Sequence, residues 1–150
     1  MPQSLSCVHI HLVFSTKNRV PLIDDQIRDP LHRYMAVVFQ DIACPSLIIN
    51  SVEDHIHTLF VLSRTMAICD VVEKIKVSSS KWIKKQDPRF RDFAWQGGYG
   101  DFGVSKSDVD SVRAYIANQR EHHRELSFQD EYRAFLHRHE ITYDERYVWD

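Results

Sequence analysis

Short β-branched segments alternate along this chain with longer segments of helical periodicity, and their order restricts the possible folds. Apolar side chains on a half-buried strand recur every second residue, whereas those on a helix recur every three or four residues. These periods predict strands at 7–14, 47–52 and 55–62 and helices at 25–40, 67–86 and 107–126. Short strand-like segments at 93–96 and 102–105 flank a glycine loop, and a short helix with an aromatic-rich extension is expected at 128–149.

Local signals refine these elements. Only Glu53 and Asp54 separate the second strand from the third, which predicts an antiparallel hairpin. Pro30 is expected to disturb the early turns of the first helix. Ser107 and Asp110 form a Ser-x-x-Asp pattern typical of a helix start.

The predicted order, βαββα followed by a strand and a helix, is typical of an α+β fold. We expect helices on one face of a largely antiparallel sheet, with a ferredoxin-like (RRM-like) core. The chain has 150 residues and contains no repeat or linker. Residues 1–150 are therefore expected to form a single domain.

Two His-x-His pairs lie in predicted strands, His9/His11 and His55/His57. Residues two apart on a strand point to the same face, so either pair would present two imidazoles side by side to a metal ion. A histidine in a strand is more often a hydrogen-bonded packing residue. The residues alone leave both interpretations open for both pairs.

Tyr115 and Gln119 are four residues apart in a predicted helix and share a face, which His122 continues. An adjacent apolar stripe of Val109, Val112 and Ile116 would dock this helix on the sheet. This spacing fits two interpretations: Tyr115 and Gln119 both face a cleft, or Tyr115 is a half-buried packing residue and Gln119 is its polar neighbour.

All four glycines, Gly97, Gly98, Gly100 and Gly103, fall within seven residues before that helix. Such a segment is typical of a ligand-contacting loop or a hinge loop, although an irregular turn would also account for it. A basic stripe follows the preceding helix and its end: Lys74, Lys81, Lys85, Arg89 and Arg91. It fits either a solvated helix face or a track for a phosphate backbone.

The remaining composition describes a protein expected in the cytosol. No apolar run approaches the ~20 residues that span a bilayer, and the first residues lack the features of a signal peptide. Three widely spaced cysteines predict reduced thiols rather than a disulfide framework. The net charge of −2 argues against a nucleic-acid partner unless basic residues are locally concentrated.

Three ordered motifs together resemble the single-tyrosine HUH transposases, and most closely the REP-associated tyrosine transposases and their insertion-sequence relatives. These are His55-Ile56-His57, the segment from Trp95 to Phe102, and Tyr115-Ile116-Ala117-Asn118-Gln119. The segments 11–19 and 144–149 also resemble the family's first strand and C-terminal end. The mildly acidic net charge departs from the usually basic relatives.

This resemblance implies that His55, His57 and Gln119 are the metal ligands and that Tyr115 is the nucleophile. It selects the second His-x-His pair, because His9/His11 lies outside the motif. It further implies a homodimer, hairpin-containing single-stranded DNA as partner, and a location on DNA in the bacterial cytosol. Mixed nitrogen and oxygen ligands favour Mn²⁺ and tolerate Mg²⁺.

The expected reaction is metal-dependent cleavage and strand transfer of single-stranded DNA. It proceeds through a 5′-phosphotyrosine intermediate, without a nucleotide cofactor or a membrane. Two alternatives are a domesticated, non-enzymatic nucleic-acid-binding regulator of the same fold and a small metal-binding protein without a DNA partner. The basic stripe argues against the second of these.

Overall fold

The computed structural model describes residues 1–150, and its centre is a four-stranded antiparallel sheet. The strands are β1 (His9–Ser15), β2 (Ser46–Ser51), β3 (His55–Val61) and β4 (Gly100–Val104), in the order β2-β3-β1-β4. With α1 (Asp25–Asp41) and α2 (Ile68–Lys84) this gives the predicted βαββαβ order and a ferredoxin-like arrangement. The α+β prediction is confirmed.

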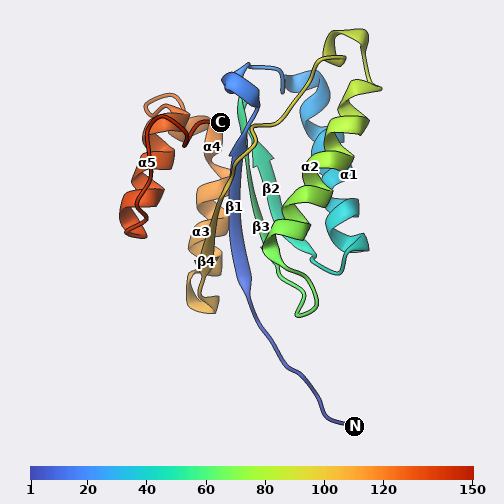
Figure 1. Cartoon of the computed structure of the whole chain (residues 1–150), viewed down its shortest axis with the longest axis vertical. Coiled ribbons are helices and arrows are strands. Elements are labelled where there is room, and N and C mark those ends of the chain that lie inside the picture. The colour runs from blue at the N-terminus through green and yellow to red at the C-terminus, as the bar shows by residue number, and fades with distance from the viewer.

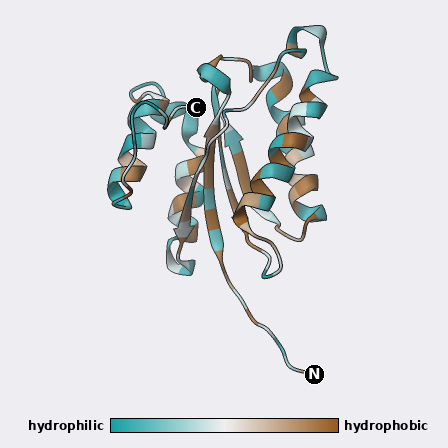
Figure 2. Ribbon diagram, viewed as in Figure 1, coloured by the Kyte–Doolittle hydropathy of each residue, from teal (hydrophilic) through white to brown (hydrophobic).

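Helices α1 and α2 cover one face of the sheet (Figure 1). Alternate strand residues face them, among them Ile10, Leu12 and Phe14 of β1. Helix α1 contributes Ile27, Leu31, Met35 and Phe39, spaced four residues apart, to the same core. Figure 2 shows hydrophobic residues concentrated on the strands and on the helices beside them.

Shorter helices cover the other face of the sheet: α3 (Val109–Ala117), α4 (Gln119–His122) and α5 (Phe128–Arg138). Leu59 of β3 packs with Val109 and Ile116 of α3. Val13 of β1 and Phe102 of β4 pack with the aromatic residues of α5. The sheet is therefore enclosed between two helical layers, and the C-terminal helices form the second layer.

Three local expectations are corrected. Pro30 lies within α1, yet the helix is unbroken. It begins after an N-cap at Asp24, whose carboxylate accepts hydrogen bonds from the backbone N–H groups of Gln26 and Ile27. Residues 93–96 form no strand; only Trp95 makes an isolated bridge, to Thr16. Ser107 and Asp110 do not start the later helix, which begins at Val109 after a 3₁₀ turn.

The predicted single helix over 107–126 is also wrong. It breaks at Asn118, whose φ and ψ are −98° and 22°. Asn50 of the edge strand β2 donates from Nδ2 to the carbonyl oxygens of Ile116 at 2.8 Å and Ala117 at 3.3 Å. These bonds satisfy carbonyls at the end of α3 and fix the junction between α3 and α4.

No helix combines the length and apolar character needed to cross a membrane.

One contact between the layers has a pH-dependent consequence. His32 of α1 is mostly buried, and its Nε2 lies 2.8 Å from Oγ of Ser51 on β2. Burial lowers the pKa of His32 from 6.5 to about 4, and the nearby carboxylate of Asp29 offsets only part of that effect.

We predict that His32 weakens the fold as the pH falls. Since its pKa is lower in the folded chain, the unfolded chain binds the proton more readily between pH 6.5 and 4. The contribution of neutral His32 is complete above pH 6.5 and falls by about 3 kcal/mol on acidification to pH 4. Urea denaturation of the wild type and His32→Gln should give unfolding free energies whose pH dependence is shallower in the variant. Parallel curves would contradict this assignment.

Candidate metal and tyrosine site

The site is built on the sheet face opposite α1 and α2. The register pairs Val13 of β1 with His57 and Ser15 with His55. His55 and His57 point to the same side of β3, as the two-residue period predicts, and both side chains are fully buried. Buried imidazoles require polar partners, and the neighbouring helices supply them.

Each of these histidines has a partner at Nδ1. His55 Nδ1 lies 2.7 Å from Oδ1 of Asp54, in the turn between β2 and β3. A carboxylate only accepts, so this nitrogen carries the hydrogen and Nε2 keeps its lone pair when the ring is neutral. His57 Nδ1 lies 2.8 Å from Nε2 of His11. Such outer partners orient metal-binding imidazoles and fix their tautomers.

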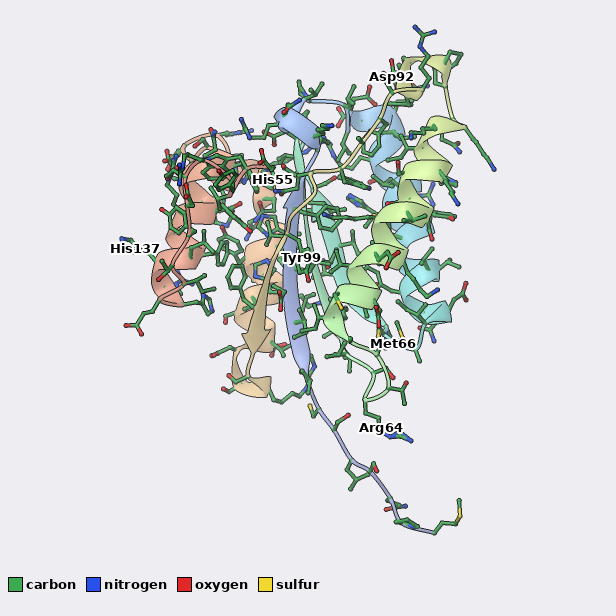
Figure 3. All side chains as sticks on the ribbon, in the orientation of Figure 1. His55, Arg64, Met66, Asp92, Tyr99 and His137 are labelled. Atoms are coloured by element: carbon green, nitrogen blue, oxygen red, sulfur yellow. The ribbon has the colours of Figure 1, made fainter.

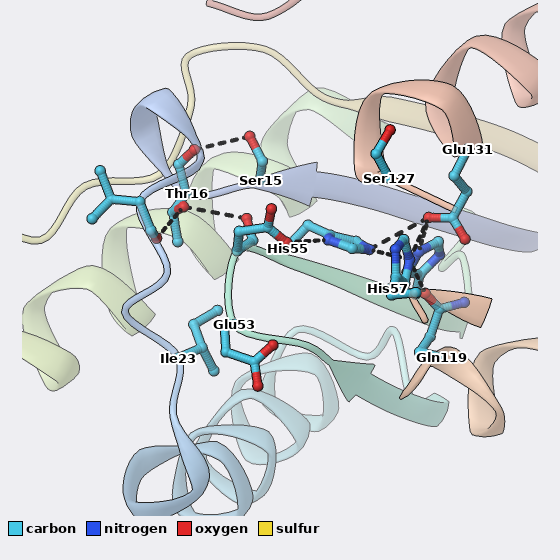
Figure 4. Close-up of polar contacts among 12 residues, drawn as sticks. Ser15, Thr16, Ile23, Glu53, His55, His57, Gln119, Ser127 and Glu131 are labelled. Atoms are coloured by element: carbon cyan, nitrogen blue, oxygen red, sulfur yellow. Dashed lines mark hydrogen bonds and ion pairs between the residues drawn. The ribbon is translucent and has the colours of Figure 1, made fainter. Parts of the chain in front are cut away.

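The Nε2 atoms of His55 and His57 point toward one location (Figure 4). Nε2 of His123 lies 2.9 Å from Nε2 of His55, and Oε1 of Glu131 lies 2.9 Å from Nε2 of His57. Oε1 of Gln119 lies 3.0 Å from Nε2 of His123. The four ligand atoms of His55, His57, His123 and Glu131 all lie within 4.8 Å of one another.

This donor set fits a divalent cation. It offers neutral imidazole nitrogens, a carboxylate and an amide oxygen, which suit first-row ions such as Mn²⁺. Burial lowers the pKa of His57 to about 4, so this ring is neutral at physiological pH. Burial opposes ionisation of Glu131, but the imidazoles of His123, His55 and His57 around its carboxylate outweigh burial and hold the pKa of that carboxyl well below its usual range.

Tyr115 lies beside this cluster. Its hydroxyl donates to Oε2 of Glu131, and its ring stacks on His122 at a centroid distance of 4.4 Å. Burial and the hydrogen bond to Glu131 raise the pKa of Tyr115, so the phenol is protonated here. A pocket of about 380 Å³ reaches Tyr115 and Glu131 and is also lined by Arg138. A second, of about 390 Å³, reaches His123 and is lined by Arg19.

The structure brings together the four residues that the family resemblance singles out: His55, His57, Tyr115 and Gln119. Three more residues join them, His11, His123 and Glu131, none of which the sequence pattern assigns to the site. The resemblance excludes His11 with its strand pair, yet His11 contacts His57 directly. The helical period predicts that His122 continues the Tyr115–Gln119 face, but the break at Asn118 turns His123 toward the cluster instead.

The sequence places this site within a known family. The profile described as "Transposase IS200 like" matches residues 4–119. The chain belongs to the IS200-like transposase family. The matched range contains His55, His57, Tyr115 and Gln119 and ends before His123 and Glu131.

Two solved structures share the fold of this transposase. A candidate transposase from Deinococcus radiodurans is 20% identical, with a TM-score of 0.62, covering 79% of this chain and 98% of the other. A REP-associated tyrosine transposase, solved bound to a REP hairpin, is 13% identical, with a TM-score of 0.60, covering 82% and 72%. No curated protein sequence matches the chain.

The glycine segment differs from the expected loop. Gly100 and Gly103 lie in β4 and pair with β1, and no glycine in the chain has a positive φ. Nζ of Lys76 lies 2.8 Å from the carbonyl oxygen of Gln96 and 2.6 Å from that of Gly98. Lys76, which flanks the basic stripe in sequence, therefore holds this segment against α2.

Gly100 is required for close packing. A Cβ there would lie 2.7 Å from Cε2 of Tyr132, a buried residue of α5. The missing side chain lets α5 dock on the sheet beside the site. At Gly103 no atom lies within 4 Å of such a Cβ.

We predict opposite outcomes for two alanine substitutions in β4. Gly100→Ala should lower the free energy of unfolding by about 1–3 kcal/mol, because it forces the Tyr132 ring out of its packed position. Gly103→Ala, the control in the same strand, should change it by less than about 0.5 kcal/mol. Urea denaturation followed by circular dichroism measures both, and equal values would refute the packing role of Gly100.

Proposed function

We propose that this transposase cleaves and rejoins single-stranded DNA through a covalent bond between Tyr115 and a 5′-phosphate. The observation that carries the proposal is the contact between the Tyr115 hydroxyl and Glu131, whose other oxygen lies among the imidazoles. A tyrosine buried for packing alone has no need of such a cluster. His55, His57 and Gln119 would hold the Mn²⁺ or Mg²⁺ ion.

Each group has a role in the reaction. When bound, the divalent cation would neutralise charge developing on the scissile phosphate. Glu131 holds the phenolic hydrogen at Oε2 and so directs the Tyr115 oxygen toward the site. In the attack the Tyr115 oxygen bonds to phosphorus while the bond from phosphorus to the 3′-oxygen breaks. The phenolic proton leaves by way of Oε2 of Glu131 and the departing 3′-oxygen takes up a proton, so the products are a 5′-phosphotyrosine and a 3′-OH. The link conserves the phosphodiester energy, so another 3′-OH can rejoin the strand.

The proposed substrate is single-stranded DNA that contains a hairpin, and the REP-associated tyrosine transposase of similar fold was solved bound to a REP hairpin. The basic stripe supports it. Its five residues are all exposed, and two of them form ion pairs, Arg89 with Asp24 and Arg91 with Asp92. The C-terminal end of α2 and the start of β3 lie toward the same end of the molecule (Figure 1). In Figure 3 the label of His55 marks the start of β3, and that of Asp92 marks the segment that follows α2. A bound hairpin would thus present its single strand near the site.

The same proposal includes that two copies of the chain act together as a homodimer. Each chain offers one Tyr115 next to the metal cluster, so exchange between two DNA ends uses two subunits. Of the predicted hinge glycines, Gly97 and Gly98 lie outside the sheet, just before β4, and a hinge there requires Lys76 to release their carbonyl oxygens.

We predict that Tyr115→Phe abolishes the covalent adduct while leaving the fold intact. The variant keeps the ring but lacks the hydroxyl, at a cost of about 1 kcal/mol for one hydrogen bond. A hairpin oligonucleotide labelled at its 3′ end should yield a labelled protein band with Mn²⁺ in the wild type and none in Tyr115→Phe. The same DNA labelled at its 5′ end should yield only a shortened oligonucleotide, because the 5′ fragment leaves with a free 3′-OH.

The matched control is Tyr143→Phe, which removes a hydroxyl from an exposed tyrosine of the C-terminal segment. It should form the adduct as the wild type does. An adduct in Tyr115→Phe would remove Tyr115 as the nucleophile.

We also predict that Lys74→Glu combined with Lys81→Glu weakens hairpin binding and its salt dependence. For every phosphate group that the variant no longer neutralises, the magnitude of the log–log salt slope should fall by roughly 0.7–0.9. Arg64→Glu combined with Lys106→Glu changes the net charge equally at exposed positions away from this stripe and should keep the slope. Fluorescence anisotropy titrations of labelled hairpin DNA at low and moderate salt measure the slope for both double variants. An unchanged slope in the Lys74/Lys81 variant would mean that the stripe is only a solvated helix face.

A further inference from the structure

Two members of the imidazole–carboxylate cluster come from the C-terminal segment of the chain. His123 follows α4, and Glu131 lies in the first turn of α5. Both lie beyond the residues that match the family profile. Glu131 is only 2% exposed, and the His123 side chain is 11% exposed, although the residues between them are mostly exposed. The segment therefore folds back to bury two polar groups at one point.

The geometry of these two residues is that of ligands rather than of outer partners. Asp54 and His11 contact the Nδ1 atoms of the β3 histidines, on the sides turned away from the cluster. His123 and Glu131 instead meet their Nε2 atoms. Oε1 of Glu131 lies 3.4 Å from Nε2 of His55, 2.9 Å from that of His57 and 3.2 Å from that of His123.

Electrostatics favours a cation at this point. The neutral tautomer of His55 directs the lone pair of its Nε2 toward Nε2 of His123, 2.9 Å away. Acceptor oxygens of Gln119 and Glu131 approach the same His123 nitrogen at 3.0 and 3.2 Å, so a single hydrogen there faces three acceptors. A shared hydrogen relieves one such contact, whereas a divalent ion satisfies all the converging nitrogens and the Glu131 carboxylate together.

We propose that His123 and Glu131 bind the same metal ion as His55 and His57, so that the ion fastens the C-terminal helices to the sheet beside Tyr115. The proposal rests on the proposed function, because it concerns the same metal centre. It adds that metal binding and docking of residues 119–138 are one coupled event. The apolar contacts of α5 with Val13 and Phe102 form the other part of this docking surface.

The first test measures Mn²⁺ binding by the full chain, stripped of metal, with isothermal titration calorimetry. Glu131→Gln keeps the shape of the side chain and removes its charge, and His123→Ala removes an imidazole. Each should weaken Mn²⁺ binding at least tenfold, the lower end of what even outer-sphere substitutions cause, roughly 10–100-fold. Glu125→Gln and His137→Ala make the same chemical changes at exposed positions of this segment and should bind as the wild type does.

A second measurement tests whether Glu131 binds the metal ion or only holds the Tyr115 hydroxyl in place. Tyr115→Phe removes the hydrogen bond to Glu131 but no ligand atom, so its Mn²⁺ affinity should match the wild type. Hydrogen exchange then reports docking: Mn²⁺ should slow exchange in α4 and α5 of the wild type and of Tyr115→Phe, but not of Glu131→Gln.

The outcomes distinguish this inference from the proposed function. The control His55→Ala should lose Mn²⁺ binding. If it does, the inference would be overturned by His123→Ala and Glu131→Gln proteins that bind Mn²⁺ as tightly as the wild type, together with no metal-dependent protection of α5. Absence of Mn²⁺ binding by the wild type would overturn the inference and the metal dependence of the proposed function together. A Glu131→Gln protein that folds, binds Mn²⁺ at least tenfold more weakly and leaves α5 unprotected supports it.

Discussion

The alternation of side chains along β1 and β3 is the constraint on which the rest of the structure depends. In β3, Ile56 and Phe60 face the core under α1 and α2, so His55, His57 and Leu59 must face the other side. A shift of one residue in the pairing would bury the histidines in the apolar layer and expose the core. Because one face is strongly apolar, the register is fixed, and the imidazoles are fixed with it.

Burying imidazoles has a cost that shapes the C-terminal half of the chain. A buried polar group without a partner costs on the order of 1–3 kcal/mol. The strands themselves supply only His11, and the turn supplies Asp54. The remaining nitrogens meet groups from helices that fold over this face, chiefly Glu131. The second helical layer therefore completes the polar network as well as covering Leu59 and Val13.

The sequence contained the local part of this site but not the long-range part. The strand period predicts the shared face of His55 and His57, and the helix period predicts the pairing of Tyr115 with Gln119. The break at Asn118 depends on Asn50, which is distant in sequence and lies on an edge strand. It replaces His122 by His123 in the cluster, and no periodicity could indicate that. Glu131 and His11 likewise join the site only through tertiary packing and strand register, which a pattern in one segment does not encode.

The proposed DNA-binding surface and the tyrosine site lie on opposite sides of the same sheet. The basic stripe lies on and just beyond α2, whereas Tyr115 lies in α3 against α5, so the sheet stands between the two groups of residues. The alternating strands nevertheless bring the end of α2 and the start of β3 toward one end of the molecule (Figure 1). Arg19, in the 3₁₀ turn after β1, also lies at this end and lines a pocket that reaches His123. A phosphate backbone that crosses this end would pass from the lysines of α2 to the cluster around the edge of the sheet, without crossing the apolar core.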